Sequence, residues 1–222
     1  PLLVAQAIQV RRRALILPEP DGPRHGVAGA GPMLRVLIAG DSSAAGVGVS
    51  HQDQAISGQL VAGLAPHFTV HWRLEARTGD TTAKALARLS ALTPAPFDVA
   101  LTALGVNDVT HQRPLRRWLA EQQAISALLR ERWGVRAQWR AGLPPMQGFP
   151  LLPRPLRDVL GAQAVRFDRA LAAVSIGSVH HHPFDPSRLD PSMMARDGFH
   201  PGPSIYAAWG AELAAMIRAE LA

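Results

Sequence analysis

The sequence contains no cysteine among its 222 residues. Disulfide bonds, thiolate metal sites and cysteine nucleophiles are therefore excluded. The absence leaves the redox compartment open, because a chain of this length can bury a substantial core without a disulfide. Internal repeats and polar low-complexity tracts are also missing, and 47% of the residues are hydrophobic. This composition is typical of a folded globular protein rather than a disordered one.

Aromatic residues are scarce, at 5% of the chain. The net charge is +6, and it comes from 23 Lys and Arg residues that are almost all Arg. The arginines are scattered along predicted helices, as in "RPLRRWLAEQQAISALLRERW", which indicates a solvated face. Binders of nucleic acid interleave basic residues with aromatic stacking platforms, and that pattern is missing here. Nucleic acid is therefore not expected as a partner.

A long hydrophobic run is missing too, since the apolar N-terminal stretch is far shorter than the ~20 residues that span a bilayer. This stretch, "PLLVAQAIQV", precedes Arg11, Arg12 and Arg13, whereas a signal peptide carries its positive charge before the apolar region. Two interpretations stay open. The segment is either a surface helix or the end of a membrane anchor, which the positive-inside rule would place on the cytoplasmic side. Localisation is not fixed, with the cytoplasm or the cytoplasmic face of a membrane favoured.

Residues 14–33 are rich in Pro and Gly and predict an irregular leader, so that residues 1–33 precede a domain over 34–222. Short apolar runs predict strands at 34–40, 68–76, 98–105, 134–144 and 177–184. Amphipathic stretches predict helices at 54–67, 80–92 with Asp80 as N-cap, 114–133, 155–174 and from about 203. Strands that alternate with helices form a parallel sheet with right-handed crossovers. We therefore expect one three-layer α/β/α domain with about five strands.

Ligands of such sheets bind at the carboxyl ends of the strands. Three predicted strands are followed directly by "GDSSAAG", "ARTGDTT" and "GVNDV", and "RDGFHPG" lies between the last strand and the last helix. Each segment alone has an ordinary structural explanation, such as a turn, a helix cap or a surface histidine. Because all four fall on one edge of the sheet, we expect their polar groups to meet.

Together these segments supply the groups that acyl transfer needs. Ser42 is a candidate nucleophile, and a serine hydroxyl needs a base to take its proton. His200 is the candidate base, and Asp197, three residues earlier, can accept a hydrogen bond from the other ring nitrogen. The candidate oxyanion donors are the backbone N–H groups of Ser42 and Gly79 and the side-chain amide of Asn107. Asp41 and Asp108 are expected to hold these loops by hydrogen bonds.

The ordered set of "GDSSAAG", "RTGDTT", "GVND" and "DGFHP" resembles the SGNH hydrolases, the GDSL-like lipase and esterase superfamily, over residues 34–222. The resemblance implies a flavodoxin-like sandwich with strand order 2-1-3-4-5 and a Ser-His-Asp hydrolase without metal or cofactor. Ser43 stands where the lipase-type motif has Leu or Ile. In this respect the segment is similar to a bacterial esterase subgroup, and true lipase activity is a weaker expectation.

The loop after the fourth predicted strand carries Leu143, Met146 and Phe149 on the same edge. With Phe199, these side chains either line an apolar acyl pocket or pack beneath the loop. We expect a carboxylic-ester hydrolase for short to medium acyl chains, acting on a small-molecule, lipid or sugar ester. Alternatives are an acyltransferase or polysaccharide deacetylase on the same site, or an inactive module that binds carbohydrate or lipid. The oligomeric state is open.

Three consecutive histidines, at 180–182, are potential metal ligands. Consecutive residues of a strand point to alternating faces, and no cluster of carboxylates stands beside these three in the sequence. We therefore do not expect a metal site there.

Overall fold

The computed structural model describes residues 1–222 and contains a six-stranded sheet in the order β1-β3-β2-β4-β5-β6. Five strands are parallel, and β1 pairs antiparallel with β3. The strands are β1 (His25–Ala28), β2 (Met33–Gly40), β3 (Thr69–Ala76), β4 (Val99–Ala103), β5 (Ala137–Ala141) and β6 (Val179–His182). Taken alone, the parallel strands have the predicted order 2-1-3-4-5.

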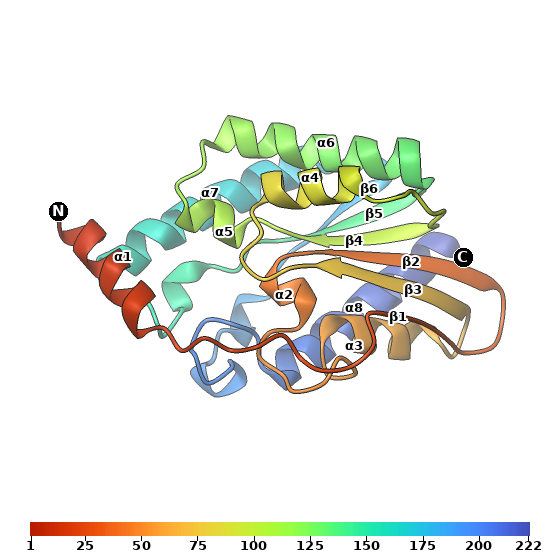
Figure 1. Ribbon diagram of the computed structural model, residues 1–222, viewed down its shortest axis with the longest axis horizontal. Coiled ribbons are helices and arrows are strands. Elements are labelled where there is room, and N and C mark those ends of the chain that lie inside the picture. The colour runs from red at the N-terminus through yellow and green to blue at the C-terminus, as the bar shows by residue number, and fades with distance from the viewer.

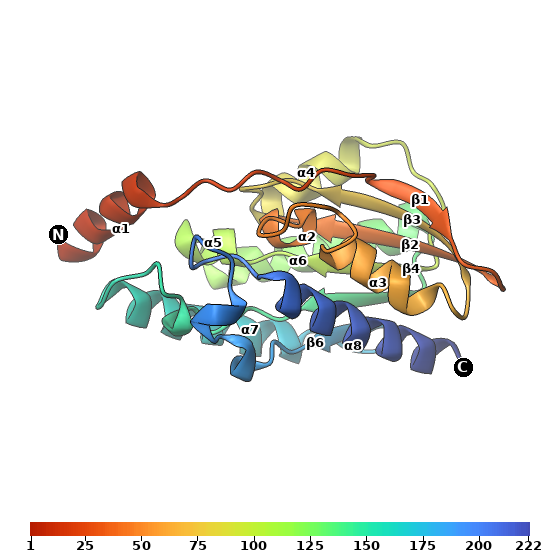
Figure 2. The same cartoon turned by 90° about the horizontal axis from the view of Figure 1, so that it is seen from below.

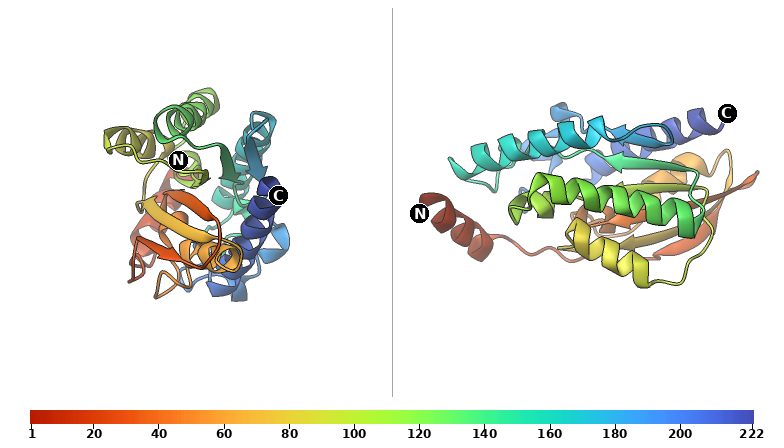
Figure 3. Two further views of the ribbon diagram at one scale, coloured as in Figure 1. Left: turned by 90° about the vertical axis from the view of Figure 1, so that its right-hand side faces the viewer. Right: turned by 90° about the horizontal axis from the view of Figure 1, so that it is seen from above.

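Helices cover both faces of the sheet, which confirms the three-layer α/β/α architecture (Figure 1). The helices α4, α6 and α7 lie on one face, and α3 and α8 lie on the other (Figure 3). The helices are α1 (Leu2–Arg13), α2 (Ser42–Ala45), α3 (Ile56–Leu64), α4 (Thr82–Ala91), α5 (Val106–Thr110), α6 (Leu115–Trp133), α7 (Leu156–Ala173) and α8 (Pro203–Leu221). Three short 3-10 turns lie at Met146–Gly148, Pro186–Arg188 and Pro191–Met193.

The apolar run of β2 is buried on both faces because the sheet is covered on both sides. Val36 and Ile38 belong to the core cluster shared with α3 and α8, whereas Leu37 and Ala39 belong to the cluster shared with α4 and α6. This alternation follows from the two-residue period of a strand. Each fully buried aliphatic side chain contributes about 1.5–3 kcal/mol, so β2 joins the two layers strongly.

The strand β1 differs from the prediction, because it lies within residues 14–33, where an irregular leader was expected. His25–Ala28 pairs with Val70–Arg73, at the edge of β3 that would otherwise be free. Two of its four residues are exposed, and the segment carries a glycine, so its strand conformation depends on the partner strand rather than on an apolar pattern. The sheet therefore has one strand more than predicted.

Two further details differ from the prediction at the carboxyl edge of the sheet. The N-cap of α4 is Thr81, whose hydroxyl accepts from the Lys84 N–H, whereas Asp80 pairs with Arg88 on the same helix. The predicted strand over 98–105 ends at Ala103, and the one-turn helix α5 begins at Val106. The chain can turn there because Gly105 adopts a φ of 143°.

The N-terminal segment forms the helix α1, none of whose residues is buried. It lies beyond the carboxyl ends of the strands, and residues 14–24 run along the domain to reach β1 (Figure 2). A helix long and apolar enough to cross a bilayer is not found anywhere in the chain.

Candidate active site

Ser42 is the first residue of α2, directly after the tight junction with β2. A Cβ atom at Gly40 would meet the Ala103 carbonyl oxygen at 2.4 Å and the Ala44 Cβ at 2.6 Å, so glycine alone fits there. Asp41 caps the helix, and its Oδ1 accepts hydrogen bonds from the N–H and the hydroxyl of Ser43. This junction holds the Ser42 side chain at the carboxyl edge of the sheet.

Ser42 lies near the start of the domain in sequence and Asp197 and His200 lie near its end, and the structure brings the three side chains together. The His200 Nε2 lies 2.9 Å from the Ser42 Oγ, and its Nδ1 lies 2.5 Å from the Asp197 Oδ2. Gly198, with a φ of 65°, forms the turn that lets the carboxylate and the ring face each other. With Nδ1–H donated to the carboxylate, Nε2 is free to accept the serine proton. The arrangement can therefore transfer a proton from the hydroxyl to the imidazole.

The Asp197 carboxylate is held in its ionised form by hydrogen bonds. Burial alone would raise its pKa, but the bonds from the His200 ring and from the backbone N–H groups of His200 and Phe199 outweigh burial and lower the pKa. Its Oδ1 accepts the two backbone bonds at 3.0 and 3.1 Å, and its Oδ2 is left for the ring. One carboxylate thus fixes both the loop and the imidazole.

The three expected oxyanion donors come from three loops that hydrogen bonds tie together. The backbone N–H groups of Ser42 and Gly79 donate to no protein group. The Asn107 Nδ2 donates to the Asp80 carbonyl at 3.0 Å and lies 3.4 Å from the Asp41 Oδ2, which links α5 to the segments that carry the other two donors. A Cβ at Gly79 would meet no neighbouring atom, so glycine is favoured there by its φ of 78° and not by lack of space.

Two buried carboxylates hold this edge of the sheet in place, as expected. Burial raises the pKa of Asp41 to about 6. Asp108 accepts hydrogen bonds from the N–H and the hydroxyl of Thr82, and this hydroxyl also accepts from the Trp118 Nε1. Burial raises the pKa of Asp108, and the bonds from Thr82 counteract the rise. The network fastens α5 to α4 and α6.

A largely apolar cleft opens beside Ser42 and His200. Leu143, Phe149 and Phe199 line it, and the last two rings meet edge to face at 4.9 Å. Met146 does not line the cleft, since its side chain is fully buried in the core cluster beneath the loop. The interpretation as packing beneath the loop therefore applies to Met146, and the other three side chains reach the cleft.

Several cleft residues were not predicted. Phe184 and Asp185 directly follow β6, so the rule that ligands bind after strand ends could have identified them. Ile205 and Trp209 come from α8, and Arg188 comes from a 3-10 turn. No motif in the sequence distinguishes these last three side chains from ordinary helix and loop residues.

The three consecutive histidines have three different surroundings. The His180 ring stacks on Trp139 at 4.9 Å, and the His181 Nε2 bonds the Asp168 Oδ1 at 2.8 Å. His182 lines the cleft with its Nε2 3.4 Å from the Glu212 Oε2, and burial lowers its pKa. His181 thus faces α7, whereas His180 and His182 lie on the opposite face of β6, near Glu220 and Glu212 of α8, as alternation along the strand requires.

Comparisons with known proteins agree with this architecture. Residues 38–208 match the model of the GDSL-like Lipase/Acylhydrolase family, whereas no curated protein matches the sequence. Similar solved structures include a carbohydrate acetylesterase from Sinorhizobium meliloti, with 16% identity, a TM-score of 0.60 and coverage of 84% of this chain and 99% of that one.

Two other solved structures have the same fold. The psychrotrophic esterase EstA from Pseudoalteromonas sp. is 20% identical, with a TM-score of 0.58 over 84% of this chain and 98% of that one. An acetylxylan esterase from Geobacillus stearothermophilus is 18% identical, with a TM-score of 0.57 over 85% and 94%. Because the family match covers most of the domain, the chain belongs to the GDSL-like lipase/acylhydrolase family and is a carboxylic-ester hydrolase.

Proposed function

We propose that this protein hydrolyses esters of short to medium acyl chains through a covalent acyl-enzyme on Ser42. The hydrogen-bonded chain from Asp197 through His200 to the Ser42 hydroxyl, at 2.5 and 2.9 Å, is the observation that carries the proposal. The separation along the chain is 158 residues between Ser42 and His200, so the fold rather than local sequence creates this contact.

The reaction has two halves. In the first, His200 Nε2 takes the proton of the Ser42 hydroxyl while the oxygen attacks the carbonyl carbon, and the imidazolium then protonates the departing alcohol. In the second, His200 takes a proton from water, the resulting hydroxide attacks the acyl carbon, and the Ser42 oxygen leaves with the proton. Asp197 stabilises the imidazolium in both halves.

The oxyanion of each tetrahedral intermediate needs donors that are not already used. The N–H groups of Ser42 and Gly79 have no protein partner, which supports their assignment as donors. The Asn107 amide is the proposed third donor: one N–H is held by the Asp80 carbonyl at 3.0 Å, and the other makes only a long contact of 3.4 Å with the Asp41 Oδ2, which the oxyanion would replace as acceptor. Donors fixed before the reaction stabilise the charge without reorganisation.

Asn107→Ala is expected to lower kcat by about 10²- to 10³-fold with little change in KM, because the lost bond forms in the transition state. Steady-state kinetics on an aryl ester would measure the effect. Thr110→Ala, on the exposed side of the same short helix, is the matched control and should keep its activity. A loss confined to KM, or an equal loss in the control, would contradict the assignment.

The cleft supports an aliphatic acyl group as the part of the substrate that it holds. Leu143, Phe149 and Phe199 provide apolar surface next to the catalytic groups, and ligand sites are lined predominantly by such side chains with a few polar groups among them. In a series of p-nitrophenyl esters, kcat/KM is expected to rise through short chains and to fall beyond about ten carbons, once the chain outgrows the cleft. A flat or rising profile beyond that length would be evidence against the proposed acyl range.

A further inference from the structure

The helix α1 presents an apolar surface that no other part of the chain covers. Its inner side is attached to the domain, since the Gln6 side chain bonds the Arg154 carbonyl and the Leu156 N–H, and Val10 packs against the core cluster of α7. Val4 and Ile8, on another side of the helix, are 62% and 48% exposed. Ile16, which follows the helix, is 91% exposed.

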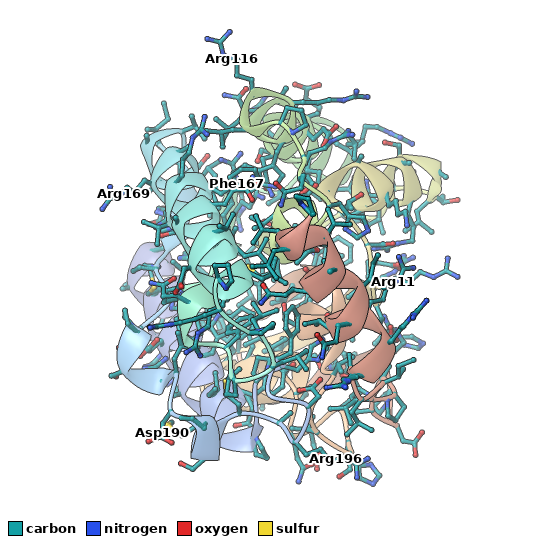
Figure 4. The ribbon with its side chains drawn as sticks, turned by 90° about the vertical axis from the view of Figure 1, so that its left-hand side faces the viewer. Arg11, Arg116, Phe167, Arg169, Asp190 and Arg196 are labelled. Carbon is teal, nitrogen blue, oxygen red and sulfur yellow. The ribbon has the colours of Figure 1, made fainter.

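Unpaired positive charge accompanies this apolar surface. Arg11, Arg12 and Arg13 occupy the last turn of α1, and residues 1–18 contain no acidic side chain. Arginines in the body of the domain, such as Arg35 and Arg188, form ion pairs with carboxylates, whereas the three of α1 form none. Figure 4 shows the Arg11 side chain extending from the helix into solvent.

The exposed aliphatic side chains and the arginines of α1 together indicate which kind of partner this surface binds. A second copy of the chain packed on this face through a two-fold axis would offer the arginines no acidic side chain from its own residues 1–18. A nucleic acid would find no aromatic residue among residues 1–18 on which to stack a base. Exposed aliphatic side chains within a turn of arginines are typical of helices that lie in the headgroup region of an anionic membrane.

We propose that α1 docks the protein on anionic lipid surfaces, with Val4, Ile8 and Ile16 inserted among the headgroups and Arg11–Arg13 against lipid phosphates. The helix lies beyond the carboxyl ends of the strands, at the end of the molecule that carries the cleft (Figure 1). Docking through α1 would therefore hold the cleft close to the lipid surface. This mode lies on the membrane and needs no spanning segment.

The test is co-sedimentation of the full 222-residue chain with vesicles of phosphatidylcholine, with or without about a third of phosphatidylglycerol. Binding is expected to the anionic vesicles only and to weaken as salt is added. The triple variant Arg11→Gln, Arg12→Gln, Arg13→Gln should bind on the order of 100-fold more weakly, because each arginine near the surface contributes about fivefold. The double variant Val4→Ser, Ile8→Ser should bind at least about tenfold more weakly.

A matched control removes three other exposed arginines. Arg116, Arg166 and Arg169 lie on α6 and α7 without ion pairs, and Figure 4 shows Arg116 and Arg169 extending away from α1. Their triple change to Gln should leave vesicle binding within about threefold, and all variants should keep the ester turnover of the parent chain. Equal losses in both triple variants, unaltered binding of the serine variant, or no binding by the parent chain would overturn the proposal. So would a dimer in solution that the α1 variants dissociate.

Discussion

Replacing Ser42 with alanine is expected to lower kcat for an aryl ester by on the order of 10⁴- to 10⁶-fold, the largest effect of any single change in the chain. Without the hydroxyl, His200 has no nucleophile to deprotonate, and only binding and the oxyanion donors remain. The same change should abolish covalent labelling by a fluorophosphonate, which attaches to an activated serine. Labelling followed by peptide mapping, together with steady-state kinetics, measures both effects.

Ser43 provides the matched control for this experiment. It also lines the cleft, but its hydroxyl is bonded to the Asp41 carboxylate and lies outside the hydrogen-bonded chain of Asp197, His200 and Ser42. Ser43→Ala should keep labelling at Ser42 and change kcat by less than about tenfold, since it removes one ordinary hydrogen bond. The nucleophile assignment would be wrong if the Ser42→Ala protein still took up the label or if Ser43→Ala lost it.

The main features of the fold could be predicted because they depend on local patterns. The β2 strand and the helix α6 have apolar spacings that leave one interpretation, and alternation of strands with helices implies parallel pairing. The strand β1 could not be predicted, since its four residues become a strand only when the edge of β3 is present. The boundary of β4 was also misplaced, because the turn depends on the positive φ of Gly105.

For the site, the sequence identified which loops meet but not which side chains point into the cleft. The rule for strand ends placed Ser42, Gly79 and Asn107 at one edge, and the structure places them there. Met146 and Phe149 lie three residues apart in one loop, yet only Phe149 reaches the cleft. Side-chain direction within an irregular loop depends on tertiary packing. Packing also decides that the Trp209 side of α8 faces the cleft, because this helix is apolar on several sides.

Asp197→Asn is expected to lower kcat by about 10⁴-fold while leaving the fold and KM nearly unchanged. The amide oxygen can take the place of Oδ1 and keep accepting the backbone N–H groups of Phe199 and His200, so the loop stays in place. The amide NH₂ then replaces Oδ2 opposite the His200 Nδ1, where two donors would face each other. The ring relieves this conflict by moving its proton to Nε2, and Nε2 can no longer accept the Ser42 proton.

Two measurements distinguish a change in the His200 tautomer from a loss of structure. Thermal unfolding should show the same midpoint for the variant and the parent chain, whereas the rate of fluorophosphonate labelling should fall in proportion to kcat, because both reactions need the same activated hydroxyl. Asp190→Asn is the control: this carboxylate caps the 3-10 turn Pro191–Met193 by accepting from the Ser192 N–H, is exposed and has no contact with a histidine ring, so its loss should leave both rates unchanged. A fall in kcat of less than about tenfold in Asp197→Asn would mean that the carboxylate does not set the ring's proton, and Asp197 would then serve only to hold its loop.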